Sequence, residues 1–125
     1  MIENEKPLVW IGSSLRDLRA FPEDVKDVVG FALSEAQNGG KHPEAKPLKG
    51  YRGAGVLEVV DDYDGNTYRA VYTIRMEGIV YALHAFQKKS KSGIATDKTD
   101  LDMVDRRLKL AQIDYAKRKG ESKNG

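Results

Sequence analysis

The feature that most constrains the fold is a nearly continuous apolar run at residues 79–86, which has the character of a central strand covered on both faces of a sheet. Upstream, residues 56–60 and 67–75 have the composition and alternation of strands. Asp64-Gly65 is a strong hairpin signal between the first two strands, and Glu77-Gly78 turns the chain into the third. The sequence therefore predicts an antiparallel meander of three strands.

Segments with helical periodicity precede and follow this meander in the sequence. Residues 22–38 and 99–115 each carry apolar side chains at three- and four-residue spacing, which predicts two amphipathic helices. A short strand at residues 8–11 and a short helix at 15–18 precede the first of them. Both amphipathic helices need an apolar surface to cover, and the sheet provides it.

The order strand, helices, meander, helix predicts the α+β class. We expect a small antiparallel sheet with the N-terminal helices and the C-terminal helix packed on one face. A length of 125 residues suits a single domain over residues 1–125. The polar ends, at about residues 1–6 and 117–125, are expected to be flexible.

Composition removes several classes of chemistry. The chain has no cysteine and two histidines, His42 and His84, so we expect neither disulfides nor a metal site, and no cofactor. The familiar hydrolase and nucleotide-binding motifs are missing. No apolar run approaches the length of a membrane span, and the first residues are polar, so a cytoplasmic protein without membrane contact is predicted.

Positive charge is concentrated in two glycine-containing loop segments. Residues 41–55 carry four cations and one acid, and residues 84–98 again carry four cations and one acid. Two such segments on one face would suit a polyanion, whereas as independent solvated loops they would bind nothing in particular. Charge alone favours the second interpretation.

Cations without thiols or metals can still carry one reaction, the cleavage of RNA by its own 2′-hydroxyl. The protein then has to position the strand and stabilise the negative charge of the phosphorane. Crowded lysines suit this chemistry, because neighbouring positive charges make a lysine a better proton donor or acceptor near neutral pH. The Lys88-Lys89-x-Lys91 run directly follows the central strand and could supply such a cluster.

Three motifs together resemble a known family. The sequence Tyr68-Arg69-Ala70-Val71-Tyr72, the run from Leu83 to Lys89 and the turn Leu48-Lys49-Gly50 are similar to the Y-R-x-x-Y, L-H-x-F-x-K-K and L-K-G patterns of HigB-like toxins in the RelE/ParE superfamily, of the phage-derived type. The similarity extends from about Trp10 to Tyr115. It implies a RelE-like fold and a ribosome-dependent mRNA endonuclease.

The resemblance also implies roles for individual residues. Arg69, Lys88 and Lys89 correspond to catalytic positions. Lys49, Arg52, Arg75 and Lys91 are expected to hold the RNA backbone, because phosphate contacts need only charge and reach. The implied partners are mRNA on the ribosome and a cognate antitoxin, HigA-like and carrying a helix-turn-helix, through which alone the protein would meet operator DNA.

Two departures from the family pattern leave alternatives open. Glu58 stands in the strand where RelE-type enzymes place lysines, and Ile94-Ala95-Thr96 stands where they place a tyrosine, so no general base or acid follows from the resemblance. A ParE-like poison of DNA gyrase and a catalytically inactive phage regulatory protein are the alternatives. His84 is interpreted first as a core histidine in an apolar strand.

Overall fold

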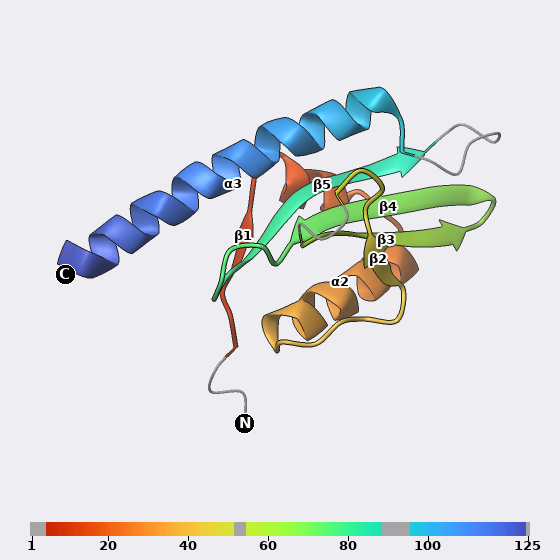
Figure 1. Cartoon of the computed structure of the whole chain (residues 1–125). Coiled ribbons are helices and arrows are strands. Elements are labelled where there is room, and N and C mark those ends of the chain that lie inside the picture. Colours follow the sequence, from red (N-terminus) through yellow and green to blue (C-terminus); the bar gives the residue numbers. More distant parts are fainter. Residues whose placement is uncertain (1–4, 52–54, 89–95, 125) are drawn as a thin grey trace.

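The computed structural model describes residues 5–51, 55–88 and 96–124, of which residues 121–124 by their backbone only. Its elements follow one another as a mixed sheet and three helices (Figure 1). They are β1 (Leu8–Trp10), α1 (Ser14–Arg19), α2 (Glu23–Gln37), β2 (Ala45–Pro47), β3 (Val56–Tyr63), β4 (Asn66–Thr73), β5 (Val80–Lys88) and α3 (Lys98–Asn124).

The predicted meander is present. Strands β3, β4 and β5 pair antiparallel in sequence order, with Tyr63 opposite Asn66 at the first hairpin. Its turn residues Asp64 and Gly65 have φ values of 52° and 80°, the left-handed backbone that a two-residue turn between twisted strands requires. The Asp-Gly signal therefore located the hairpin correctly.

The sheet differs from the expectation at both edges. Its order is β1-β5-β4-β3-β2, and β1 runs parallel to β5, so the sheet is mixed and not purely antiparallel. This direction arises because α1 and α2 carry the chain from β1 across one face to the far edge before the meander returns it. There β2, inside the segment expected to be a loop, pairs antiparallel with β3.

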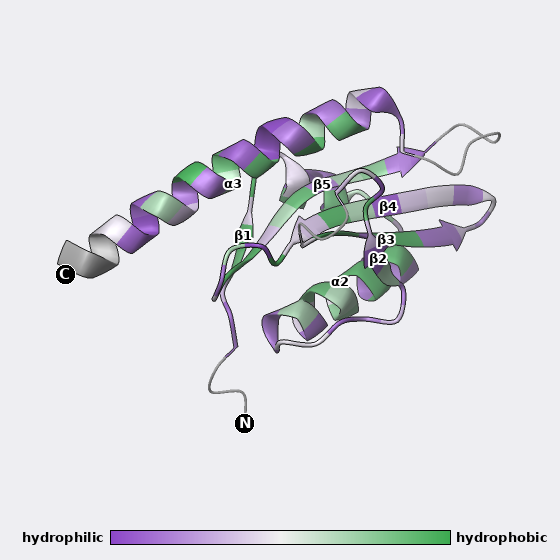
Figure 2. Ribbon diagram, in the orientation of Figure 1, coloured by the Kyte–Doolittle hydropathy of each residue, from purple (hydrophilic) through white to green (hydrophobic). Residues whose placement is uncertain are grey.

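The expected α+β class is confirmed, but the helices cover both faces of the sheet (Figure 1). On one face, α1 and α2 pack against residues such as Ala70 and Tyr72. On the other, α3 packs against residues such as Val71 and Tyr81. The meander strands carry apolar side chains on both sides, so one layer of helices could not bury them all. Figure 2 shows this as hydrophobic strand centres between α2 and α3.

A buried arginine attaches α3 to the sheet. Arg107 donates hydrogen bonds to the backbone oxygen of Leu83 at 2.9 Å and to Ser13 Oγ at 2.8 Å. Burial lowers the pKa of Arg107. Gly12, with φ +58°, lets the turn after β1 pass this guanidinium, because a Cβ there would lie 2.8 Å from Arg107 Nε.

Among the described residues, no helix combines the length and apolar character that a membrane crossing requires.

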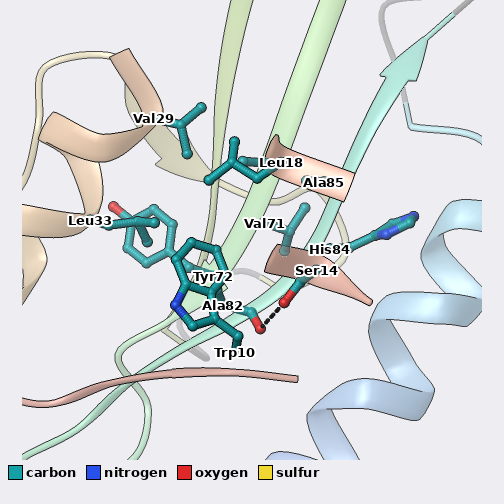
Figure 3. A pocket seen from close by; sticks show the side chains of 11 residues that line it. Trp10, Ser14, Leu18, Val29, Leu33, Val71, Tyr72, Ala82, His84 and Ala85 are labelled. Carbon is teal, nitrogen blue, oxygen red and sulfur yellow. Dashed lines mark hydrogen bonds between the residues drawn. The ribbon is translucent and has the colours of Figure 1, made fainter. Parts of the chain in front are cut away.

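The core on the α2 side is closely packed. A void of about 10 Å³ remains beside Trp10, Leu33 and Tyr72, about the space that one water molecule needs (Figure 3). Ser14 Oγ donates to the backbone oxygen of Ala82 at its edge. His84 contributes to the wall, but its ring points away from these side chains and toward α3 (Figure 3). This void belongs to the core and is too small for a substrate.

Candidate functional site

Arg69 lies in β4 on the sheet face that α3 covers, and it is 5% exposed. In the β3–β4 register Arg69 is opposite Val60, which places Glu58 on the same face two residues along β3. Arg69 Nη1 donates to Glu58 Oε1 at 2.7 Å and to Thr96 Oγ1 at 3.3 Å. The predicted phosphate-binding arginine is thus held between a strand carboxylate and the segment that leads into α3.

Lys88 ends β5 on the same face, since it follows Phe86, which packs into the α3-side core, by two residues. Its side chain is 4% exposed, and Nζ lies 3.1 Å from Asp97 Oδ1. The Asp97 side chain is 61% exposed. The ammonium group is therefore buried behind a carboxylate that faces water.

His84 is the third basic group on this face. Its Nε2 lies 2.8 Å from Asp100 Oδ1, and its ring stacks on Phe86 with the centroids 4.6 Å apart. Its Nδ1 is buried, and within the described part of the chain it has no hydrogen-bond partner. The side chain is buried between β5 and α3 with one ring nitrogen paired, which agrees with the interpretation of His84 as a core histidine.

These residues form one arrangement, named the cation cluster after Arg69 and Lys88: the basic side chains of Arg69, His84 and Lys88 each face an acid, Glu58, Asp100 and Asp97 respectively. A buried cation that already faces a carboxylate can exchange it for another anion, such as a phosphate oxygen, without being left unpaired. Glu58 could also accept a proton. The cluster therefore has the chemistry to bind a phosphodiester and to move charge around it.

Sequence reasoning identified the cations Arg69 and Lys88 but missed the three acids. Asp97 and Asp100 lie around the start of α3, where acids usually serve as helix caps. Glu58 occupies a strand position that alternates with apolar residues and so resembles a solvent-facing side chain. The β3–β4 register, which the sequence does not provide, is the signal that brings Glu58 to Arg69.

The expected RNA-binding residues are distributed unequally. Lys49 is exposed and lines a hollow together with Thr96, the residue that contacts Arg69. Arg75 is also exposed, but it lies two residues beyond the C-terminal end of β4 and six residues from Arg69, at most about 20 Å away at the rise of an extended chain. Arg52, Lys89 and Lys91 lie outside the described residues.

Within the described ranges, no cluster of three or more histidine, aspartate or glutamate side chains is arranged to hold a metal ion. Each basic side chain of the cation cluster lies within 3.1 Å of its own acid. The groups that the cluster offers to a bound molecule are thus a guanidinium, an imidazole, an ammonium and three carboxylates.

A family model described as "Phage derived protein Gp49-like (DUF891)" matches residues 16–109. The chain belongs to this Gp49-like family. The match spans the structure from α1 into α3, so it includes every residue of the cation cluster. The predicted membership of a phage-derived family is confirmed.

A solved structure of the Escherichia coli toxin RelE, a double arginine-to-alanine mutant in the free state, is similar to the Gp49-like chain. The two are 16% identical, the TM-score is 0.53, and the alignment covers 85% of this chain and 97% of the other. The RelE-like fold predicted from the sequence is confirmed. No curated protein matches the chain.

Proposed function

We propose that this Gp49-like protein is the toxin of a type II toxin-antitoxin system and an endonuclease that cuts mRNA on the ribosome. The observation that carries the proposal is the cation cluster, which gathers Arg69 and Lys88 on one face of a RelE-like sheet. Membership of the Gp49-like family supports a phage-derived toxin.

In the proposed reaction the ribose 2′-hydroxyl attacks the adjacent phosphorus, the bond from phosphorus to the 5′-oxygen breaks, and the 5′-oxygen leaves as a hydroxyl with a proton taken from water. Arg69 and Lys88 contact the non-bridging oxygens and stabilise the charge that develops on the phosphorane. Once phosphate occupies Arg69, Glu58 is left to accept the hydroxyl proton. The sequence adds Lys89, adjacent to Lys88, as a further cation. The proposed reaction requires no metal or cofactor.

RNA has to replace carboxylates to reach these cations. Asp97 is the easiest to displace, because its side chain is largely exposed and water can hydrate it again at little cost. Asp100 and Glu58 are more buried, at 26% and 13% side-chain exposure. We infer that phosphate enters beside Asp97, at the end of β5.

The proposed partners are mRNA in the ribosomal decoding site and a HigA-like antitoxin with a helix-turn-helix. An antitoxin that covers the face carrying Lys49 and the end of β5 would keep RNA from the cluster. Contact with operator DNA would then be made by the antitoxin alone.

Induced expression of the wild-type chain without antitoxin tests the proposal. Protein synthesis, followed by pulse labelling, should stop before DNA synthesis, and mRNA should carry new ends inside its coding regions. Lys88→Met keeps the buried stem and removes the charge, so it should fold and lose toxicity. Lys89→Ala should also weaken toxicity.

Arg69 needs a compensated variant, because its removal leaves Glu58 buried without a cation. The double variant Glu58→Gln/Arg69→Gln keeps a neutral hydrogen-bonding pair and should be non-toxic. Val29→Ala, in α2 on the opposite sheet face, is a control of reduced stability and should remain toxic at equal expression. Full toxicity of Lys88→Met and the double variant would refute the site, and early arrest of DNA synthesis with linearised plasmid would indicate gyrase.

A further inference from the structure

A hollow of about 320 Å³ lies between the turn after β2 and the start of α3. It is lined by Leu48, Lys49, Gly50, Thr96 and Leu101. Leu48 and Leu101 pack into the α3-side core and form its apolar part, while Lys49 is exposed. Gly50 has φ +92°, and a Cβ there would meet nothing within 4 Å.

One residue, Thr96, both lines the hollow and contacts the cation cluster. Thr96 Oγ1 accepts a hydrogen bond from Arg69 Nη1 at 3.3 Å, so its own hydroxyl hydrogen remains available for donation. Within the described part of the chain, the structure gives this hydroxyl no acceptor. A molecule in the hollow would therefore meet a hydrogen-bond donor next to the phosphate position at Arg69.

We propose that this hollow binds one nucleobase of the RNA strand whose phosphate occupies Arg69, and that Thr96 favours bases with a carbonyl oxygen. This inference rests on the proposed function and adds base selection to it. Guanine, cytosine and uracil carry such an oxygen beside the ring, whereas adenine does not. Thr96 would then discriminate against adenine at one position of the cut site.

Three properties of the hollow favour a base as its occupant. Its volume lies at the small end of the range for small-molecule sites, about 300 to 1,000 Å³. Two of its five lining residues are leucines, Leu48 and Leu101, and apolar side chains commonly hold an unstacked base by its faces. Lys49 at the rim supplies a positive charge for the neighbouring phosphate, which single-stranded RNA carries on every nucleotide.

Binding can be measured without any reaction. In titrations of the ¹⁵N-labelled full chain with guanosine and adenosine monophosphate, the amide signals of Gly50, Thr96 and Leu101 should shift, and guanosine monophosphate should bind more tightly. Thr96→Val should reduce this difference roughly threefold to tenfold, the range for one neutral hydrogen bond. Thr99→Val, at an exposed position three residues along, is the matched control and should leave it unchanged.

The same variants can be compared by sequencing the 5′ ends of mRNA cut in cells. Thr96→Val should raise the share of adenine at one position of the cut sites, and Thr99→Val should reproduce the wild-type pattern. Leu101→Trp fills the hollow and should abolish both the amide shifts and base preference, whereas Leu110→Trp, at an exposed position of α3, should not.

The two proposals fail separately. If no nucleotide shifts the hollow's amides, and cut sites are the same in wild type, Thr96→Val and Leu101→Trp, the hollow does not bind a base, even when Lys88→Met abolishes toxicity. If the amides shift with guanosine preference but Lys88→Met remains toxic, the hollow binds a base and the proposed reaction is wrong.

Discussion

Replacing Arg69 by alanine should destabilise the fold strongly, whatever the residue does in a reaction. Arg69 and Glu58 are 6% and 13% exposed in their side chains, and Nη1 and Oε1 are 2.7 Å apart. Removing the arginine leaves a carboxylate in a place where water reaches it poorly. Breaking a buried pair from one side typically costs about 3 to 5 kcal/mol.

That loss is large for this chain, because the free energy of unfolding of an ordinary domain is about 5 to 15 kcal/mol. Removing both charges avoids it. In Glu58→Leu/Arg69→Leu two apolar side chains replace the pair, and such replacements are commonly neutral or stabilising. We therefore expect the double variant to recover most of the stability that Arg69→Ala loses.

Urea unfolding followed by the fluorescence of Trp10 measures these changes. Trp10 is the one tryptophan of the sequence and packs against the α2-side core. With a slope of about 2 kcal/mol/M, a loss of about 4 kcal/mol moves the midpoint down by about 2 M. Arg75→Ala, at an exposed position, is the control and should change stability by less than about 0.5 kcal/mol.

A shift for Arg69→Ala no larger than that of Arg75→Ala would refute the reasoning, because it would mean that Glu58 is solvated without its partner. A double variant as unstable as Arg69→Ala would also contradict it. Loss of toxicity in Arg69→Ala alone does not separate folding from chemistry, so the compensated variant and Lys88→Met are the more informative tests.

Three further predictions concern stability and binding. Burial raises the pKa of Tyr72 to about 12. Because ionisation is easier in the unfolded chain, stability should fall as pH rises from about 10 to 12. Burial and the hydrogen bond to Asp114 raise the pKa of Tyr81 as well, so Tyr72→Phe should reduce that fall in urea titrations without abolishing it. Gly39→Ala, with φ +87° and open space, should cost only the backbone strain, about 1 to 3 kcal/mol. Gly12→Ala has φ +58° and should cost more than the strain alone, since its Cβ also meets the hydrogen-bonded Arg107, as thermal unfolding would show. Lys49→Ala should weaken binding to ribosomes and lower its salt dependence by about one phosphate contact; an unchanged slope would make Lys49 an ordinary surface lysine.

Much of the fold could be predicted because the relevant signals are local. Asp64-Gly65 favours a hairpin turn at its own position, and the apolar spacing that predicts a helix at residues 22–38 lies within that one segment. The partners of strands are not local. Nothing in residues 8–11 specifies that β1 joins β5 in parallel, and residues 45–47 are polar enough to resemble a loop until β3 offers them hydrogen bonds.

The site shows the same limit at the level of side chains. Arg69 and Lys88 could be proposed because their neighbours match a family pattern. Their burial and their pairing with acids could not be predicted, because pairing depends on which residues the strand register and the start of α3 bring into contact. Thr96 gives no signal in the sequence, since its position between Arg69 and the hollow exists only after folding.

The parallel edge strand has a consequence for the order of folding. Leu8 pairs with Val80, so the first strand to be synthesised stays without its partner until β5 has been made. The cation cluster is completed later still, because Asp97 and Asp100 follow β5 in the chain. Contacts this distant in sequence slow folding relative to local ones. During translation the nascent chain therefore cannot assemble the whole site, and a shorter product that ends at β5 would keep Glu58 beside Arg69 but carry His84 and Lys88 without Asp100 and Asp97.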